Sequence, residues 1–131
     1  MYPLSLSSTY LRLRPDSSIE PIPVDGFWPR LMSGELGDFR NEYLVTSAQY
    51  ETNWNGWEMH PHGEEIVCVL SGAARMLLET PDGTRSEVEL SGAGSYVLIP
   101  RGTWHTAQIV APVAMLFITA GEDTRHRPVV G

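Results

Sequence analysis

The sequence predicts an all-β protein, a sandwich or barrel of about eight short strands. From about residue 42 onward, short apolar or alternating segments of strand length follow one another at close spacing. Turn sequences separate these segments, and no window of the chain shows a sustained helical apolar period. About eight short strands at this spacing are typical of β-sandwiches and β-barrels.

The first 34 residues differ from the rest because they contain five prolines. Within them, residues 9–14 alternate in the manner of a short edge strand. Residues 27–37 contain two glycines and a proline, which predicts a loop that includes one helical turn. We therefore expect an N-terminal arm over residues 1–34.

Strand-like segments fill the region that follows, at residues 42–52, 56–60, 65–71, 73–80, 84–90, 95–99, 105–110 and 113–119. Residues 81–83 (Pro-Asp-Gly) form a tight-turn sequence, residues 91–94 break the next pair, and residues 111–112 (Ala-Pro) separate the last two segments. We expect one barrel domain over residues 35–120 and a polar, extended or frayed C-terminal tail over residues 121–131.

Composition excludes several classes of protein. The net charge of −7 comes from 16 acidic and 9 basic residues, and the arginines are scattered, so a nucleic-acid partner is not expected. A single cysteine, Cys68, allows no internal disulfide, and its apolar neighbours indicate a small buried hydrophobe. Neither a signal-peptide pattern nor an apolar run of membrane-spanning length is present, so we expect a cytoplasmic protein without a membrane partner.

The first chemically informative stretch is residues 57–65. Alternate residues of a strand face the same side, so Glu58 and His60 project together. Pro61 predicts the end of that strand, because proline cannot donate to the ladder. Glu65 then begins an apolar strand on its buried face. Carboxylates and imidazoles on inward faces are costly unless a partner satisfies them, and a divalent cation would do so.

The second stretch ends in a Pro-x-Gly turn followed by a histidine, and it resembles a motif of the cupin superfamily. That motif consists of a glycine, five residues, Pro-x-Gly, two residues and histidine, which Gly94, Pro100, Gly102 and His105 match. The asparagine usual four residues later is absent, because Ile109 occupies its place.

The first stretch is similar to the other cupin motif, whose glutamate and glycine, separated by six residues, correspond to Glu65 and Gly72. Together the two motifs cover residues 58–109, which is 52 of the 131 residues. The resemblance implies a cupin double-stranded β-helix, or jelly-roll barrel, with an N-terminal arm.

The His-x-His element of the first motif fits in two registers. One takes His60 and His62 as the pair and leaves only two residues before Glu65. The other keeps the family's four-residue gap, which places His60 in the second histidine position and Glu58 in the first. We prefer the second register because it preserves both the turn length and the strand phase.

The preferred register implies one divalent transition metal (iron, manganese, nickel or zinc) held by Glu58, His60, Glu65 and His105, with His62 as the alternative ligand. Two imidazoles and two carboxylates suit these metals, and the subset of two histidines and one carboxylate suits Fe(II) with open positions. Because Glu58 occupies a position where the motif has histidine, a barrel whose metal affinity is weak or lost is the alternative.

The resemblance implies a metal-dependent enzyme, an oxygenase or isomerase, that acts on a small polar molecule in the barrel. The alternatives are a non-catalytic small-molecule binding or sensing cupin with weak or no metal, and a structural barrel with a vestigial site. No catalytic residue is assigned, and His126 is expected to be solvated. Cupins of this kind are usually homodimers, and residues 9–14 are suited to extending a partner's sheet.

Overall fold

The structure, a computed structural model, describes residues 1–130, so Gly131 of the expected tail lies outside the described residues. Strands make up 53% of the chain and helix 5%, which confirms the predicted all-β class. The elements in chain order are β1 (Thr9–Leu13), β2 (Ile19–Pro23), α1 (Phe27–Met32), β3 (Tyr43–Tyr50), β4 (Gly56–Met59), β5 (Glu65–Glu79), β6 (Arg85–Ser91), β7 (Ser95–Ile99), β8 (Trp104–Thr119) and β9 (Arg125–Pro128).

Two long antiparallel strands, β5 and β8, organise the barrel. They pair with each other along most of their length and take part in both walls. In one wall the order is β7-β5-β8-β3-β1-β2, and in the other it is β6-β5-β8-β4-β9. The two walls form the double sheet of a jelly-roll barrel, the fold that the resemblance to cupins implied.

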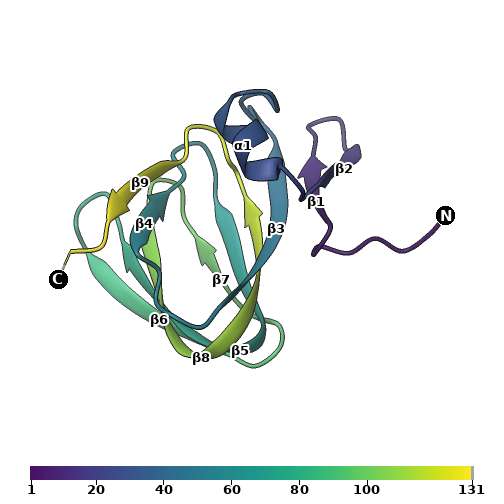
Figure 1. Cartoon of the computed structure of the whole chain (residues 1–131). Helices are drawn as coiled ribbons and strands as arrows, with labels where there is room; N and C mark the ends of the chain where they lie inside the picture. Colours follow the sequence, from purple (N-terminus) through teal and green to yellow (C-terminus); the bar gives the residue numbers. More distant parts are fainter. Residues whose placement is uncertain (131) are drawn as a thin grey trace.

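Both long strands bend in the middle, where they curve around the lower end of the barrel (Figure 1). The register between them shifts on either side of Ser71 and again before Ala74, which marks bulges. Gly72 lies at this bend with a φ of +80°, a backbone conformation that favours glycine. Four predicted segments, at 65–71, 73–80, 105–110 and 113–119, are therefore two strands, because a bulge bends a strand without ending it.

The bend determines which residues meet at the barrel mouth. Glu65, at the start of β5, pairs with Thr119 at the end of β8. His105, near the start of β8, pairs with Leu78 near the end of β5. Because the paired strands fold back on themselves, these two distant ends of the ladder come together at one end of the barrel.

The N-terminal region packs against the outer part of this framework. Strand β1 pairs with β3 of its own chain and with β2. The sequence did not predict β2, whose two prolines are tolerated because it is an edge strand. Together with α1 and β3, these elements enclose a second apolar cluster of Tyr10, Ile22, Phe27, Leu36, Phe39 and Leu44.

The C-terminal tail, expected to be extended or frayed, contains the strand β9, which pairs with β4 (Figure 1). In this pairing His126 lies opposite Glu58. The sequence of β9, Arg-His-Arg-Pro, has no apolar alternation, so hydrophobic periodicity gave no signal for it.

The main core lies between the two walls and is built from alternate residues of β5, β7 and β8. Along β5, Val67, Val69, Ala74 and Met76 are fully buried. The half-buried Cys68 lies on the opposite face of that strand, so its prediction as a buried hydrophobe was wrong. Within residues 1–130, no helix has the length and apolar character needed to cross a membrane.

Candidate metal centre

The four candidate ligands of the preferred register come together at the barrel mouth. Each of Glu58, His60, Glu65 and His105 offers one ligand atom, and these atoms all lie within 4.8 Å of one another. His105, Glu65 and His60 are buried, whereas the side chain of Glu58 is 36% exposed. Three of the four therefore face the interior, and Glu58 faces the cavity that leads to them.

A backbone contact ties the two motifs together. The turn that precedes β8 donates a hydrogen bond from the amide of Gly102 to the carbonyl oxygen of His60, at 3.0 Å. Glu58 also pairs directly with His105 across β4 and β8. These main-chain contacts hold the ends of β4 and β8 side by side, so that their side chains meet.

The buried donor atoms converge without bonding to one another in hydrogen-bond geometry. Nε2 of His105 lies 2.8 Å from Oε1 of Glu65, and Nε2 of His60 lies 3.4 Å from the same oxygen. Within residues 1–130, none of these three atoms has a hydrogen-bond partner. Oε2 of Glu58 lies 3.9 Å from both nitrogens. Buried polar atoms normally have partners, and a metal ion among these four would satisfy them all.

The remaining polar atom of each buried candidate ligand is held by a second contact. Nδ1 of His105 lies 3.2 Å from the carbonyl oxygen of Thr103, to which only an N–H can donate. Nδ1 of His60 lies 2.9 Å from Oγ1 of Thr124, and Oγ1 of Thr119 donates to Oε2 of Glu65 at 2.6 Å. In neutral His105 the lone pair therefore lies on Nε2, the atom that faces the centre, as metal-binding histidines require.

Removal of one such contact should weaken metal binding while the ligands remain intact. Thr119→Val deletes the hydroxyl that bonds to Glu65 but keeps the side-chain shape. We expect metal affinity to fall about 10- to 100-fold, the usual effect of losing an outer contact. Thr106→Val is the matched control, because its hydroxyl bonds to the carbonyl of Gly56 instead. Competition with a chromophoric chelator measures both variants, and equal losses would contradict the role of Thr119.

The electrostatics of the metal-free centre follow from burial and close pairing. Burial alone would raise the pKa of Glu65, but the adjacent imidazoles of His105 and His60 outweigh it and lower this pKa to about 2. Burial alone would lower the pKa of His105, but the carboxylate of Glu65 outweighs it and raises this pKa. In the metal-free protein, the centre therefore favours an ion pair between the two residues.

This ion pair predicts how pH affects the stability of the metal-free protein. The lowered pKa of Glu65 stabilises the fold above its unfolded value of 4.5, and this contribution is lost as pH falls toward about 2. The raised pKa of His105 stabilises the fold below its unfolded value of 6.5, and this contribution is lost as pH rises through the folded pKa. Urea unfolding should therefore show the largest contribution between pH 4.5 and 6.5.

The test compares the metal-free wild type with Glu65→Gln, which removes the carboxylate charge. The difference in their free energies of unfolding should shrink above pH 6.5 and below pH 4.5. A difference that stays constant from pH 3 to pH 9 would show that the pair contributes no pH-dependent stability.

The structure separates His62, the alternative ligand, from the four converging residues. Its side chain is 49% exposed, and its Nε2 lies 3.0 Å from Oδ2 of Asp123. With the half-buried Glu122, these two residues form a separate group.

Several residues at the centre were not identified from the sequence. His126, expected to be solvated, has a side chain that is 66% exposed, but its Nε2 lies 3.3 Å from Oε1 of Glu58. The threonines that contact the ligands, Thr103, Thr119 and Thr124, also carried no signal. His126 lies opposite Glu58 because β9 pairs with β4, and the sequence did not predict β9.

A cavity of about 710 Å³ opens onto the centre and reaches Glu58, His60 and Glu65. Its inner wall is aromatic, because the ring of Trp54 lies 5.6 Å from that of Tyr50 and 5.9 Å from that of Phe117, between centroids. The outer part is lined by α1, by the segment that follows it, and by the connection between β8 and β9. These parts lie at the same end of the barrel (Figure 1).

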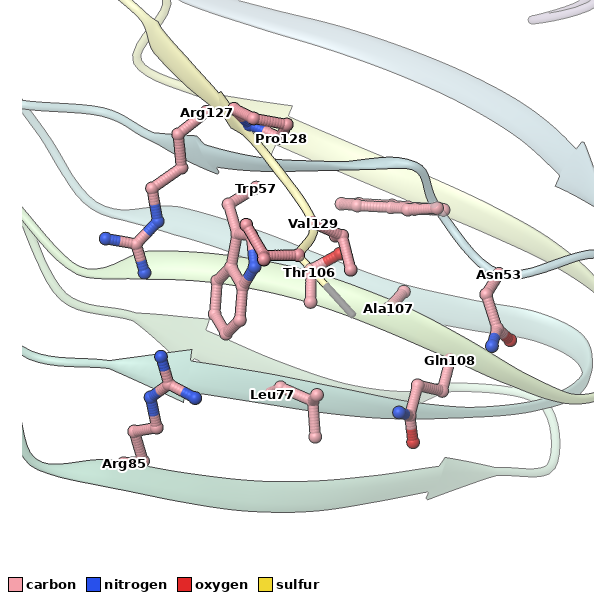
Figure 2. Close-up of a pocket in the computed structure, with 12 residues that line it drawn as sticks. Asn53, Trp57, Leu77, Arg85, Thr106, Ala107, Gln108, Arg127, Pro128 and Val129 are labelled. Atoms are coloured by element: carbon pink, nitrogen blue, oxygen red, sulfur yellow. The ribbon is translucent and has the colours of Figure 1, made fainter.

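A second hollow of about 540 Å³ lies elsewhere, and none of the four converging residues lines it. Figure 2 shows its walls, in which the guanidinium groups of Arg85 and Arg127 approach Trp57. Both groups also bind the carboxylate of Glu79, at 2.8 and 2.7 Å. The arginines of this hollow are therefore already neutralised by an acidic partner.

The chain matches no protein-family model and no curated protein. Its structure is similar to hydroquinone 1,2-dioxygenase from Sphingomonas sp. TTNP3, solved with 4-hydroxybenzoate bound, with a TM-score of 0.52, 23% identity and 61% of each chain covered. It is also similar to Bacillus subtilis oxalate decarboxylase, which has Mn(II) centres, with a TM-score of 0.54 and 20% identity over 66% of this chain and 24% of that chain. An oxalate oxidase structure matches with a TM-score of 0.54 and 18% identity, over 63% of this chain and 44% of that one.

These enzymes are cupin-family proteins, and the fold they share with this chain is the cupin barrel. The chain therefore folds as a cupin domain, as its two motifs indicated. The match spans 61% of the dioxygenase chain and 24% of the decarboxylase chain.

Proposed function

We propose that this protein is a metal-dependent cupin that holds one divalent transition metal through Glu58, His60, Glu65 and His105. The observation that carries the proposal is that two imidazoles and two carboxylates, three of them on buried residues, place their ligand atoms within 4.8 Å of one another. The threonine contacts behind them support it, because they orient the donor atoms toward one point.

Iron, manganese, nickel and zinc are the proposed metals, because two imidazoles and two carboxylates form a mixed nitrogen and oxygen donor set. Mn(II) is present in the structurally similar oxalate decarboxylase, and Cd²⁺ in a structure of the hydroquinone 1,2-dioxygenase PnpCD. Both are divalent ions, in agreement with the charge of the proposed donor set.

The proposed activity is oxygenase or isomerase chemistry on a small molecule bound in the cavity. A bound metal would supply Lewis-acid or dioxygen chemistry to that molecule. The chain's own residues Tyr50, Trp54 and Phe117 form the aromatic inner wall of the cavity in which that molecule would bind. Burial, together with the charge of Glu58, raises the pKa of Tyr50 to about 12, so its phenol stays protonated even in alkaline solution and can donate a hydrogen bond.

One observation favours the alternative of a non-catalytic binding or sensing cupin. Glu58 occupies a position where the cupin motif has histidine, and its second oxygen is engaged by His126. A carboxylate shared between His126 and the centre would weaken its hold on a metal.

The activity test is a comparison of turnover and binding in the same preparations. Purified protein is stripped with a chelator, reloaded with each metal, and mixed with small-molecule candidates under air and under nitrogen. A substrate-triggered rate that requires added metal supports the enzyme. Ligand-induced thermal stabilisation without turnover for any metal would instead favour the binding protein.

We further propose a homodimer, supported by an apolar outer face on β5 and β7. Leu70, Tyr96 and Leu98 are 46%, 60% and 56% exposed, and the half-buried Ile66 and Cys68 lie on the same face of β5. A second copy can cover this uncharged face without repulsion between two chains of net charge −7. Light scattering that gave a monomer mass would contradict the dimer.

A further inference from the structure

We infer that the cavity at the metal centre selects an aromatic molecule that is uncharged or positively charged, and that it rejects carboxylates such as oxalate. This inference deepens the proposed function, because it names the substrate class of the same site. It follows from the walls of the cavity and from the charges that face it.

Aromatic rings surround the approach to the proposed metal-binding residues. The ring of Trp54 lies 6.4 Å from that of His105 and 5.9 Å from that of Phe117, between centroids. Farther out, Phe39 is buried, while Trp28 of α1 is 53% exposed and lines the same cavity. Such walls favour a flat apolar body, since aromatic pairs gain energy beyond the burial of surface.

The charged residues that line the cavity are acidic. The carboxylates are those of Asp38, Glu58, Glu65 and Asp123. Among residues 1–130 the lining includes no arginine, and arginine is the only basic residue besides histidine in this sequence. The lining histidines are His60 and His126, which lie beside Glu65 and Glu58. A carboxylate ligand would therefore meet repulsion and find no guanidinium with which to pair.

Arg12, the one buried arginine among residues 1–130, is already engaged. The guanidinium of Arg12 lies behind Phe39, 4.0 Å from its ring centroid, and donates to the carbonyl oxygen of Leu36. It also lies 3.6 Å from carboxylate oxygens of both Glu20 and Glu42. This group is consequently not available to bind an anion in the cavity.

The proposed metal does not reverse this balance. The two carboxylates of Glu58 and Glu65 offset the charge of a divalent ion, so the loaded centre is neutral. A histidine in place of Glu58, as in the cupin motif, would leave the centre with a net positive charge that attracts anions. With Asp38 and Asp123 at the mouth, the loaded cavity keeps an acidic character.

The experiment uses three ligands that share one ring and differ in charge: 4-hydroxybenzamidine, 4-hydroxybenzamide and 4-hydroxybenzoate, with oxalate as the small carboxylate. Calorimetry on the full chain gives their dissociation constants with and without metal. We expect the amidine and the amide each to bind at least about tenfold more tightly than the benzoate and oxalate. The carboxylates of the last two would lie close to the acidic side chains of the cavity without a basic partner. Tighter or equal binding of either carboxylate, or no binding of the amidine and the amide, would overturn the inference.

Two variants test the cause of the selectivity. Asp38→Arg should strengthen 4-hydroxybenzoate binding, whereas Asp25→Arg, which makes the same change of net charge at an exposed position outside the cavity, should not. Trp54→Leu should weaken binding of all three aromatic ligands and leave metal content unchanged. Equal effects of the two arginine variants would refute a local charge mechanism.

Metal content, measured in parallel, separates this inference from the proposed function. If the protein takes up no metal but still prefers the amidine and amide, the metal-dependent function fails and the substrate class stands. If it binds metal and prefers 4-hydroxybenzoate or oxalate, the function stands and the substrate class fails.

Discussion

His105→Ala should abolish stoichiometric metal binding, from about one equivalent per chain to background. His105 is fully buried, and its Nε2 lies closer than that of His60 to Oε1 of Glu65, the shared point of convergence. Its loss removes a donor that no neighbour can replace, and it leaves Glu65 as a buried carboxylate with one partner fewer. Elemental analysis of the untagged variant, beside the wild type, measures the effect.

The matched control is His62→Ala, because His62 is an exposed histidine whose partner is Asp123. It should retain the metal, whereas His60→Ala should lose it. Glu58→Ala should reduce metal content by more than His62→Ala does. The opposite order for Glu58 and His62 would show that the other register of the first motif is correct.

Gly72→Ala should produce the largest loss of stability of any single-methyl addition in the barrel. A Cβ at this position would overlap the carbonyl oxygen of Pro112 and lie 2.8 Å from Cα of Val113, both parts of the backbone of β8. The φ of +80° adds strain for any residue other than glycine. Together the overlap and the strain should cost about 3 kcal/mol or more, measured by urea unfolding.

Gly83→Ala separates the two contributions. Gly83 has a φ of +87°, but a Cβ there meets nothing within 4 Å, so this variant should lose only about 1 kcal/mol. Because the bend at Gly72 brings Glu65 and His105 together, folded Gly72→Ala protein should also bind metal more weakly. Equal losses of stability in the two variants would show that the bend tolerates a side chain.

The fold was largely predictable because strand length and turn chemistry are local properties. The turn at residues 81–83 and the break at residues 91–94 were read directly from their glycines, proline and aspartate. The continuity of β5 and β8 could not be predicted from the sequence, since glycine and proline usually end strands and these strands contain Gly72 and Pro112. Here they lie at a bulged bend, and only the partner strand reveals that pairing continues across it.

The four converging residues were also predictable, because strand alternation and motif spacing act together on Glu58 and His60. The contacts behind them were not. Thr119 and Thr124 reach the centre only through the pairing of β5 with β8 and the course of the tail, and an isolated threonine has no chemical signature. The contact of His126 with Glu58 was not predicted, because β9 is recognisable only from its pairing with β4. Contacts of this kind depend on tertiary structure.

Elemental analysis of the 131-residue chain, purified without an affinity tag and quantified by absorbance, decides whether the barrel mouth holds a metal. We expect about one equivalent per chain of iron, manganese, nickel or zinc, or uptake of about one equivalent on titration of the stripped protein. Protein that contains no metal and takes up none on titration would contradict it, and the converging residues would then be an ion-paired site for an organic ligand.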